Sequence, residues 1–267
     1  MWAMVLAGGR GIRLGHLTEK VSKPMIPIAG APLLERQVRW LAAGGVTDIL
    51  FLLVYKPESV WAHFREGEKF GVRIHYYVGD SLKYGTGGMV RAGLDVLSRD
   101  TSMPILPSPS IQALTSPLPS ILPSTLQLPS IPPSPQFVVT NGDVLTDEPL
   151  ASIPRYEDGH TILSAMMPGS YGVLETLGNH VSVFHEAPFS WINAGVYILH
   201  PNIYLPEQGP IERVLAIEAM RMRLYIHRTD KWWRSLDSFK DLLVMEEHFG
   251  EGYENKTHVR RHTPGLA

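Results

Sequence analysis

Short apolar runs alternate along the chain with segments in which apolar residues recur every three or four positions. The runs are typical of buried strands and the spaced positions of amphipathic helices. In the first half the pattern predicts strands at 4–7, 48–55, 72–78 and 137–140, and helices beginning near Leu34 and over 59–69 and 87–98. Because parallel strands are usually joined by crossover helices, this alternation predicts an α/β fold with a mainly parallel, mixed sheet flanked by helices.

The second half continues the alternation with less regular spacing. The pattern predicts strands at 161–167, 172–175, 181–185, 191–199 and 224–228, and helices at 149–156, 211–221 and 238–249. The strand at 191–199 is interrupted by Asn193-Ala194-Gly195, so we expect an irregularity there.

One stretch, 101–136, breaks the pattern: it is rich in proline and serine and contains no charged residue. Proline fixes φ and removes a backbone donor, so we expect polyproline II or disorder. We interpret the stretch as a surface insertion in a single domain spanning 1–252, followed by a tail at 253–267. A ligand for a proline-recognition domain is the alternative.

Composition excludes several classes of function. The 24 Lys and Arg residues nearly balance 26 Asp and Glu residues, and no basic run indicates a nucleic-acid partner. The absence of cysteine excludes disulfides, thiolate metal sites and cysteine nucleophiles. The longest apolar run, 49–54, is too short to span a bilayer, so we expect a cytoplasmic protein without membrane insertion.

A glycine-dense turn follows the first strand: Gly8, Gly9 and Gly11 are separated only by Arg10. Such a turn can direct backbone N–H groups at an anion, although many α/β proteins turn tightly here for packing alone. Arg13 and Lys23 follow within a dozen residues. Two cations near a nest of N–H groups favour a polyphosphate ligand.

Two aspartates follow predicted strands and are candidate metal ligands. Asp143 comes directly after the strand at 137–140, at the edge where open α/β sheets bind ligands, and Asp237 lies before the last helix. Each could hold Mg²⁺, but Asp143 could equally cap a turn and Asp237 could be a helix N-cap.

Seven segments in order then carry a resemblance: LAGGRGIRL, SKPMIPIAGAPLL, YGTGG, VTNGDVLTD, SYGVLE, INAGVYILHP and a late tryptophan-aspartate segment. Together they resemble the sugar-1-phosphate nucleotidyltransferases, also called NDP-sugar pyrophosphorylases. The resemblance implies a Rossmann-like nucleotide-diphospho-sugar transferase fold. It also implies transfer of a nucleotidyl group from an NTP to a sugar 1-phosphate, with release of pyrophosphate, in the presence of Mg²⁺.

The resemblance also implies roles for individual residues. Catalysis is assigned to Arg13, Lys23 and Asp143, and metal binding to Asp143 and Asp237. Nucleotide binding is assigned to Leu6, Gly8, Gly9, Gly11, Gly85, Thr86, Gly87 and Gly88. Sugar binding is assigned to Tyr171, Gly172, Glu186, Asn193 and Gly195. An NTP and a sugar 1-phosphate are the implied partners, and a homo-oligomer is possible.

The sequence departs from the family pattern at Ile12, where threonine is common, and at Ala187, where the family has a lysine that meets the sugar phosphate. Arg234 or Lys231 could replace that lysine. The Leu236-Asp237-Ser238 segment is similar to glucose-1-phosphate cytidylyltransferases, whereas Gly-Thr-Gly-Gly is similar to heptose-1-phosphate guanylyltransferases, so base and sugar stay open.

Two alternative functions stay open beside the nucleotidyltransferase. A non-catalytic nucleotide- or sugar-binding regulatory module on the same fold would account for Ala187. A glycosyltransferase that consumes a nucleotide sugar would share the style of fold but would leave Arg13 and Lys23 beside the glycine turn unexplained.

Overall fold

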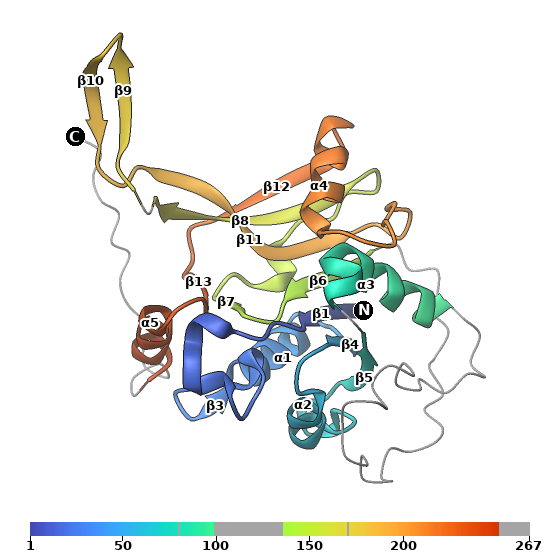
Figure 1. The fold of residues 1–267 in the computed structure, drawn as a ribbon. Helices are drawn as coiled ribbons and strands as arrows, with labels where there is room; N and C mark the ends of the chain where they lie inside the picture. The colour runs from blue at the N-terminus through green and yellow to red at the C-terminus, as the bar shows by residue number, and fades with distance from the viewer. Residues whose placement is uncertain (80, 99–135, 170, 251–267) are drawn as a thin grey trace.

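Figure 1 shows a computed structural model of the chain, which describes residues 1–79, 81–98, 136–169 and 171–250. Within these residues the largest sheet has seven strands in the order β12-β8-β11-β6-β1-β4-β5. They are β1 (Trp2–Ala7), β4 (Asp48–Leu53), β5 (Arg73–Val78), β6 (Phe137–Asn141), β8 (His160–Pro168), β11 (Phe189–Leu199) and β12 (Leu224–Thr229). β11 is antiparallel to both its neighbours and the other pairs are parallel, so the predicted mixed α/β sheet is confirmed.

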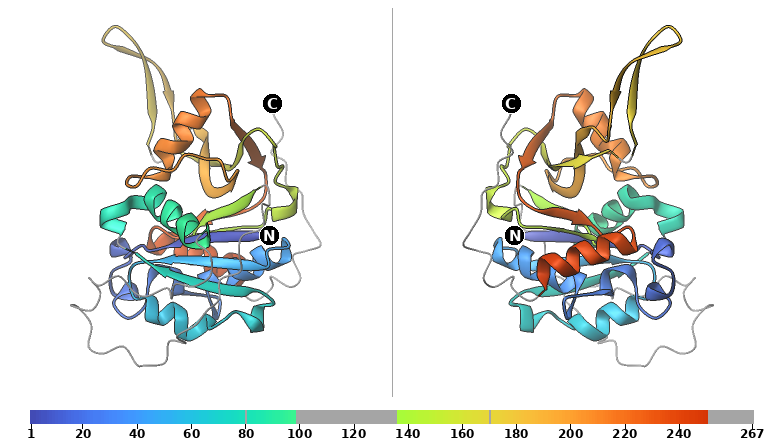
Figure 2. Two further views of the ribbon diagram at one scale, coloured as in Figure 1. Left: turned by 90° about the vertical axis from the view of Figure 1, so that its right-hand side faces the viewer. Right: turned by 90° about the vertical axis from the view of Figure 1, so that its left-hand side faces the viewer.

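Helices cover both faces of this sheet because its strands are apolar on both sides. They are α1 (Leu33–Ala43), α2 (Pro57–Phe64), α3 (Ser81–Ser98) and α4 (Ile211–Met220), whereas α5 (Phe239–Phe249) packs in a separate core with Leu145 and Leu236. In β1, Ala3 and Val5 pack in the core that includes α1 and α2, whereas Met4 packs in the core that includes α3 and α4. Figure 2 shows these two pairs of helices on opposite faces.

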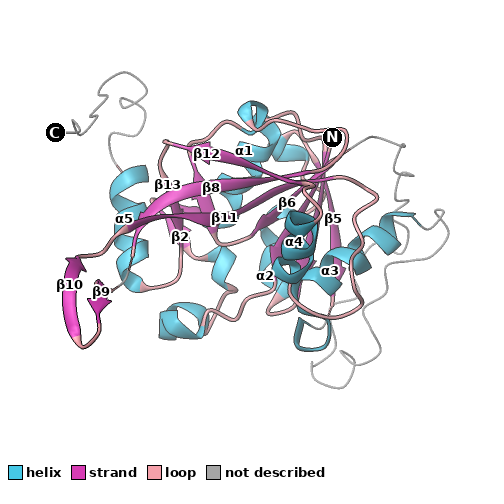
Figure 3. Cartoon of the chain, turned by 90° about the horizontal axis from the view of Figure 1, so that it is seen from above, coloured by secondary structure: helices cyan, strands magenta, loops and turns pink. Residues whose placement is uncertain are grey.

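Three two-stranded sheets complete the described structure: β2 (Pro27–Ile28) with β3 (Ala31–Pro32), β7 (Val144–Thr146) with β13 (Trp233–Ser235), and β9 (Val173–Leu177) with β10 (His180–His185). The β7–β13 pair sets Ser235 opposite Val144, and the Leu236 N–H donates to the Asp143 carbonyl over 2.9 Å. This pairing brings two segments far apart in sequence to one place. The β9–β10 hairpin instead projects away from the body (Figures 1 and 3).

Most predicted elements are confirmed, with differences at proline and glycine. The predicted helix at 149–156 is wrong: only a 3₁₀ turn, Leu150–Ser152, forms, because Pro154 cannot continue a helix. The helix predicted over 59–69 ends at Phe64, where Arg65 takes a positive φ of 50°. The helix predicted to begin at Gly87 begins at Ser81 and contains a kink at Gly85.

The predicted insertion at 101–136 lies outside the described residues except for Gln136, and the predicted tail at 253–267 lies wholly outside them. The division into one domain therefore stays a prediction. No helix in the described part of the chain combines the length and apolarity that a membrane crossing needs.

Candidate active site

The glycine-dense turn joins the end of β1 to a 3₁₀ segment, Ile12–Thr18. Gly11 has a φ of 65°, and a Cβ there would lie 2.8 Å from the Thr18 methyl group. A Cβ on Gly8 would lie 2.7 Å from a Val54 methyl group. Packing therefore requires glycine at both positions. A Cβ on Gly9 would meet nothing within 4 Å, so packing does not explain the glycine there.

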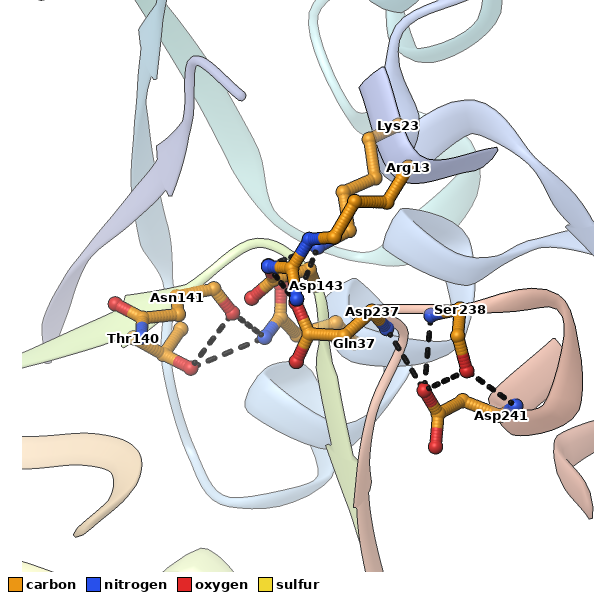
Figure 4. A network of polar contacts seen from close by, with 9 residues as sticks. All are labelled: Arg13, Lys23, Gln37, Thr140, Asn141, Asp143, Asp237, Ser238 and Asp241. Carbon is orange, nitrogen blue, oxygen red and sulfur yellow. Dashed lines mark hydrogen bonds and ion pairs between the residues drawn. The ribbon is translucent and has the colours of Figure 1, made fainter. Parts of the chain in front are cut away.

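Four charged side chains from four separate segments meet beside this turn (Figure 4). The Lys23 ammonium donates to Asp143 Oδ2 over 2.7 Å and to Asp237 Oδ1 over 3.2 Å. Arg13 Nη2 donates to the same Asp237 oxygen over 3.1 Å. Both carboxylates thus lie within reach of one nitrogen, and the two predicted metal ligands are neighbours in space.

Burial differs sharply among these four groups. The Lys23 side chain is 10% exposed, whereas that of Arg13 is 77% exposed. Burial by itself would raise the pKa of Asp237, but the charge of Lys23, hydrogen bonds from Ser235 and Lys23, and the charge of Arg13 outweigh it. The pKa of Asp237 therefore lies below its ordinary value, and the carboxylate is ionised at neutral pH.

Asp143 is held by the turn that contains it. The Gly142 N–H donates to the Leu6 carbonyl over 2.9 Å, so the turn lies against the end of β1. A Cβ on Gly142 would lie 3.0 Å from that same carbonyl oxygen. The side chain of Gln37 on α1 donates to the carbonyl oxygens of Asn141 and Val144, on either side of the turn. The turn is therefore attached to two different elements.

Asp237 is held from the other side by the start of α5. Ser238 and Asp241 form a reciprocal capping box, in which Asp241 Oδ2 accepts from the Ser238 N–H over 2.9 Å and from the Asp237 N–H over 3.2 Å. Ser238 is thus the N-cap, and the alternative of Asp237 as the cap is wrong. The Asp237 carboxylate points instead toward Lys23 and Arg13 (Figure 4).

The pair of carboxylates fits a magnesium ion that is also held by substrate. Mg²⁺ prefers oxygen ligands and commonly binds through one or two carboxylates, with water and phosphate oxygens completing its shell. Among the residues described, no cluster of three or more His, Cys, Asp or Glu side chains exists that could form an all-protein cage. Asp143 and Asp237 would hold the ion, and Lys23, which contacts one oxygen of each, would lie beside it.

The Gly85–Gly88 segment packs against the loop before α4. The Gly87 N–H donates to the Gly209 carbonyl over 2.9 Å, and a Cβ on Gly85 would lie 2.7 Å from the same oxygen. A Cβ on Gly88 would lie 2.4 Å from the Glu207 carbonyl oxygen. Thr86 Oγ1 accepts from the Ile211 N–H over 2.9 Å. Close packing therefore explains these glycines, and their predicted contact with nucleotide stays a prediction.

Two of the predicted sugar-binding residues lie next to the Asp143 turn. Gly195 has a φ of 72°, and a Cβ there would lie 2.7 Å from Asn141 Nδ2. Asn193 Oδ1 accepts from the Gly195 N–H over 2.9 Å, and its Nδ2 donates to the Tyr197 hydroxyl over 2.8 Å. Burial raises the pKa of Tyr197 to about 12, with the charge of Asp143 among the smaller contributions. The predicted interruption of β11 thus adjoins the acidic pair.

The other three predicted sugar-binding residues belong to the projecting hairpin and its base. Tyr171 is 84% exposed, and Glu186 is also exposed. A Cβ on Gly172 would meet the Phe184 ring at 2.7 Å, so this glycine serves packing within the hairpin. Figure 3 shows the hairpin at one end of the molecule, away from the central sheet. The structure does not gather these residues with Asn193 into one enclosed pocket.

Comparison with known proteins fits this geometry. A sequence profile described as "Nucleotidyl transferase" matches residues 2–120, which include the glycine turn, Arg13 and Lys23. This part of the chain is similar to the nucleotidyltransferase family. The chain is 28% identical over 261 residues to the mannose-1-phosphate guanyltransferase of Candida albicans, covering 91% of this chain and 63% of the relative. It is 30% identical over 217 residues to the enzyme of that name from Aspergillus fumigatus, covering 76% and 50%.

The chain thus spans between half and two thirds of the length of these curated relatives. Among solved structures, a putative glucose-1-phosphate thymidylyltransferase from Bacillus anthracis superposes with a TM-score of 0.65 at 17% identity, covering 95% of this chain and 99% of that one. HddC from Yersinia pseudotuberculosis complexed with GMP-PN superposes with a TM-score of 0.61 at 20% identity, covering 93% and 99%. At these identities the two structures show the shared fold, which confirms the predicted Rossmann-like class.

The roles of three residues at or near the site went unnoticed in the sequence. Gln37 holds the Asp143 turn, and no motif marks it because its partners lie on distant strands. Asp241 holds Asp237 through the capping box at the start of α5, which the Ser238-x-x-Asp241 spacing could have indicated. Arg228 on β12 is in register with Ser164 of β8, which is in register with Asn193 of β11. Its guanidinium lies 5.4 Å from the centre of the Trp191 ring.

Arg228 is therefore a cation in register with Asn193, two strands away across β8. The two predicted substitutes for the missing lysine have other partners. Arg234 Nη1 lies 3.8 Å from Asp241 Oδ1, and Lys231 Nζ lies 3.4 Å from Asp230 Oδ1. Among the three, Arg228 is the one that strand register places in line with a predicted sugar-binding residue.

Proposed function

We propose that this chain transfers a nucleotidyl group from an NTP to a sugar 1-phosphate, giving an NDP-sugar and pyrophosphate. One observation carries the proposal: Arg13, Lys23, Asp143 and Asp237 meet within hydrogen-bonding distance beside a glycine turn at the end of β1. The similarity to curated relatives that are named as enzymes of this class supports the proposal.

In the proposed reaction an oxygen of the sugar phosphate attacks the α-phosphorus of the NTP. The bond between the α-phosphorus and the bridging oxygen breaks, and its electron pair leaves with pyrophosphate. Such transfers need little covalent participation by the protein, and the rate depends on alignment and on neutralisation of phosphate charge.

The charged residues are suited to those two tasks. Lys23 is buried and held by two carboxylates, so its ammonium is a fixed positive charge at the reacting centre. Arg13 is mostly exposed and has a single ion-pair partner among the described residues, so it is free to exchange that contact for a phosphate oxygen. Mg²⁺ held by Asp143 and Asp237 would supply further positive charge and join substrate phosphate to protein.

The names of the relatives suggest which substrates to test first. The curated relatives above are named as mannose-1-phosphate guanyltransferases, so GTP and mannose 1-phosphate are the first pair. The product would supply an activated sugar for polysaccharide or other glycan assembly. The cytoplasmic location and a homo-oligomeric state stay predictions.

One observation favours a second candidate. Ala187 stands where the family has a lysine, and it adopts a positive φ of 46°. A regulatory module that binds nucleotide or sugar without turnover would not need that lysine.

Pyrophosphate release by the full chain with Mg²⁺ tests the proposal. The four ribonucleoside triphosphates and dTTP would be screened against sugar 1-phosphates, beginning with mannose 1-phosphate. Release that needs one NTP and one sugar phosphate together, and that Asp143→Asn abolishes, is the expected result. Nucleotide binding by folded protein without pyrophosphate release across the panel would favour the regulatory module.

A further inference from the structure

Gln37 is a buried polar residue in the middle of α1, on the helix face turned toward the sheet. It is 2% exposed, and it lies among residues of the core such as Leu34 and Leu41. Burying an amide without hydrogen bonds costs free energy, so the partners of a buried glutamine indicate what it does in the fold.

The Gln37 Nε2 group has three acceptors, all close to Asp143 in the chain. It donates to the Asn141 carbonyl over 2.7 Å, to the Thr140 hydroxyl over 3.0 Å and to the Val144 carbonyl over 3.2 Å. These acceptors end β6 and begin β7, and the turn between them contains Gly142 and Asp143 (Figure 4). One amide group therefore joins both sides of the turn to α1.

The orientation of this amide is fixed by its surroundings. Two of the three acceptors are backbone carbonyls, which can only accept, so the NH₂ group and not the oxygen must face the turn. The other end of the amide, Oε1, is buried and has no hydrogen-bond partner among the described residues. An unpaired buried oxygen opposes stability, whereas the bonds donated by Nε2 connect the turn to α1.

The helix that carries Gln37 is itself anchored to the chain beyond the turn. Three residues further along α1, the Trp40 indole donates to the Glu148 carbonyl over 2.7 Å. This contact restrains α1, so Gln37 cannot simply move together with the turn. It connects the turn to a fixed element.

We propose that Gln37 is a positioning residue of this active site, which holds the turn so that the Asp143 carboxylate faces Lys23 and the metal. The inference rests on the proposed function, because it takes Asp143 as a metal ligand. Asp237 has separate support through Asp241, so loss of Gln37 would displace one member of the acidic pair relative to the other. A displacement of about 1 Å at such a site can reduce the rate about 100-fold.

Gln37→Met tests the proposal because methionine keeps the length and packing of the side chain but removes both N–H donors. We expect kcat to fall about 10- to 100-fold, the Mg²⁺ concentration for half-maximal rate to rise, and the KM for both substrates to change less than about threefold. A merely structural role would lower the melting temperature without changing the metal dependence of the folded enzyme.

Gln136→Met is the matched control. Gln136 is also a buried glutamine, and its Nε2 donates to two backbone carbonyls, those of Tyr156 over 2.6 Å and Gly159 over 3.0 Å. It lies at the other end of β6, away from the Asp143 turn. This variant should lose stability with no change in kcat or in the Mg²⁺ requirement.

Two readouts do not depend on turnover: Mn²⁺ binding followed by electron paramagnetic resonance, and hydrogen exchange of the Gly142 amide, which is bonded to the Leu6 carbonyl. Weaker Mn²⁺ binding and faster Gly142 exchange in Gln37→Met, but not in Gln136→Met, are the expected results. Equal Mn²⁺ affinity and equal exchange in wild type and Gln37→Met would overturn the inference even if turnover is confirmed. If the wild type proves inactive but Gln37→Met still shows weaker Mn²⁺ binding and faster Gly142 exchange, the positioning role stands and only the proposed reaction is contradicted.

Discussion

The predicted phosphate side and the predicted sugar side of this protein are built in different ways. On the phosphate side, Lys23 contacts two aspartates that come from opposite ends of the second half of the chain, and each aspartate is held by its own partner. On the sugar side, Tyr171 and Glu186 are exposed at the β9–β10 hairpin, which pairs only with itself among the described residues. A two-stranded hairpin alone is marginally stable in water. The body of the fold therefore positions Lys23 and the two aspartates, whereas it does not position Tyr171 and Glu186.

If this contrast is correct, substitutions on the phosphate side should affect turnover and those on the hairpin should affect sugar binding. The largest effect is expected from Asp143→Asn, which keeps the size of the side chain and removes its charge. Loss of a metal ligand at the reacting centre should lower kcat on the order of 1,000-fold or more, measured as pyrophosphate release. Asp230→Asn, at an exposed aspartate beside Lys231, is the control and should keep wild-type activity.

Lys23→Met should have the next largest effect, about 100- to 1,000-fold on kcat, because it removes a positioned charge and leaves two carboxylates facing each other. It should also change the pH dependence of stability. The pKa of Asp237 is lowered in the folded state, partly by Lys23. The stabilisation is therefore present above the ordinary carboxyl value of about 4 and is lost as the pH falls through the lowered folded pKa.

Urea unfolding at pH 7 and pH 3 measures this effect. The difference in unfolding free energy between wild type and Lys23→Met should be larger at pH 7. A difference that is the same at both pH values would show that the ion pairs with Lys23 do not stabilise the fold.

Arg13→Gln should have a smaller effect, because the side chain is mostly exposed and its ion pair with Asp237 is screened by solvent. We expect the KM for the NTP to rise about tenfold, with little change in melting temperature. Unchanged steady-state kinetics would remove Arg13 from the phosphate site and leave Lys23 as its described cation.

Glu186→Gln should have the smallest effect, a rise of about two- to fivefold in the KM for the sugar 1-phosphate and none in the KM for the NTP. Glu247→Gln, at an exposed glutamate on α5, is the matched control. A fall of about tenfold in kcat for Glu186→Gln would show that the hairpin contributes to turnover. The two sides would then not be separate, and the contrast would fail.

Several residues of the charged cluster could be found in the sequence because they follow simple local rules. Gly11 must adopt a positive φ, and Asp143 follows a buried strand, so both could be found from short-range patterns. Asp237 was a candidate metal ligand from its place before the last helix, but its position beside Asp143 depends on the pairing of β13 with β7. Pairing between strands about 90 residues apart leaves no local signal.

The same reason explains what the sequence did not reveal. Gln37 occupies an ordinary helical position, and only its tertiary contacts show that it supports the Asp143 turn. Asp241 supports Asp237 through a local capping box, which the Ser238-x-x-Asp241 spacing could have indicated. Arg228 is in line with Asn193 only through the register of three strands. The helix predicted at 149–156 fails for a local reason, since Pro154 lies within it, and the interruption of β11 at 193–195 was predicted correctly from its glycine.

A double-mutant cycle on Asp143 and Asp237 tests the central claim most directly, namely that the two carboxylates act as one metal-binding unit. The rate of pyrophosphate release would be measured for wild type, Asp143→Asn, Asp237→Asn and the double variant. If both hold one ion, the double variant should be no slower than the slower single variant, because the first substitution already removes the shared function. Losses that multiply in the double variant would contradict the claim and show that the two aspartates act independently.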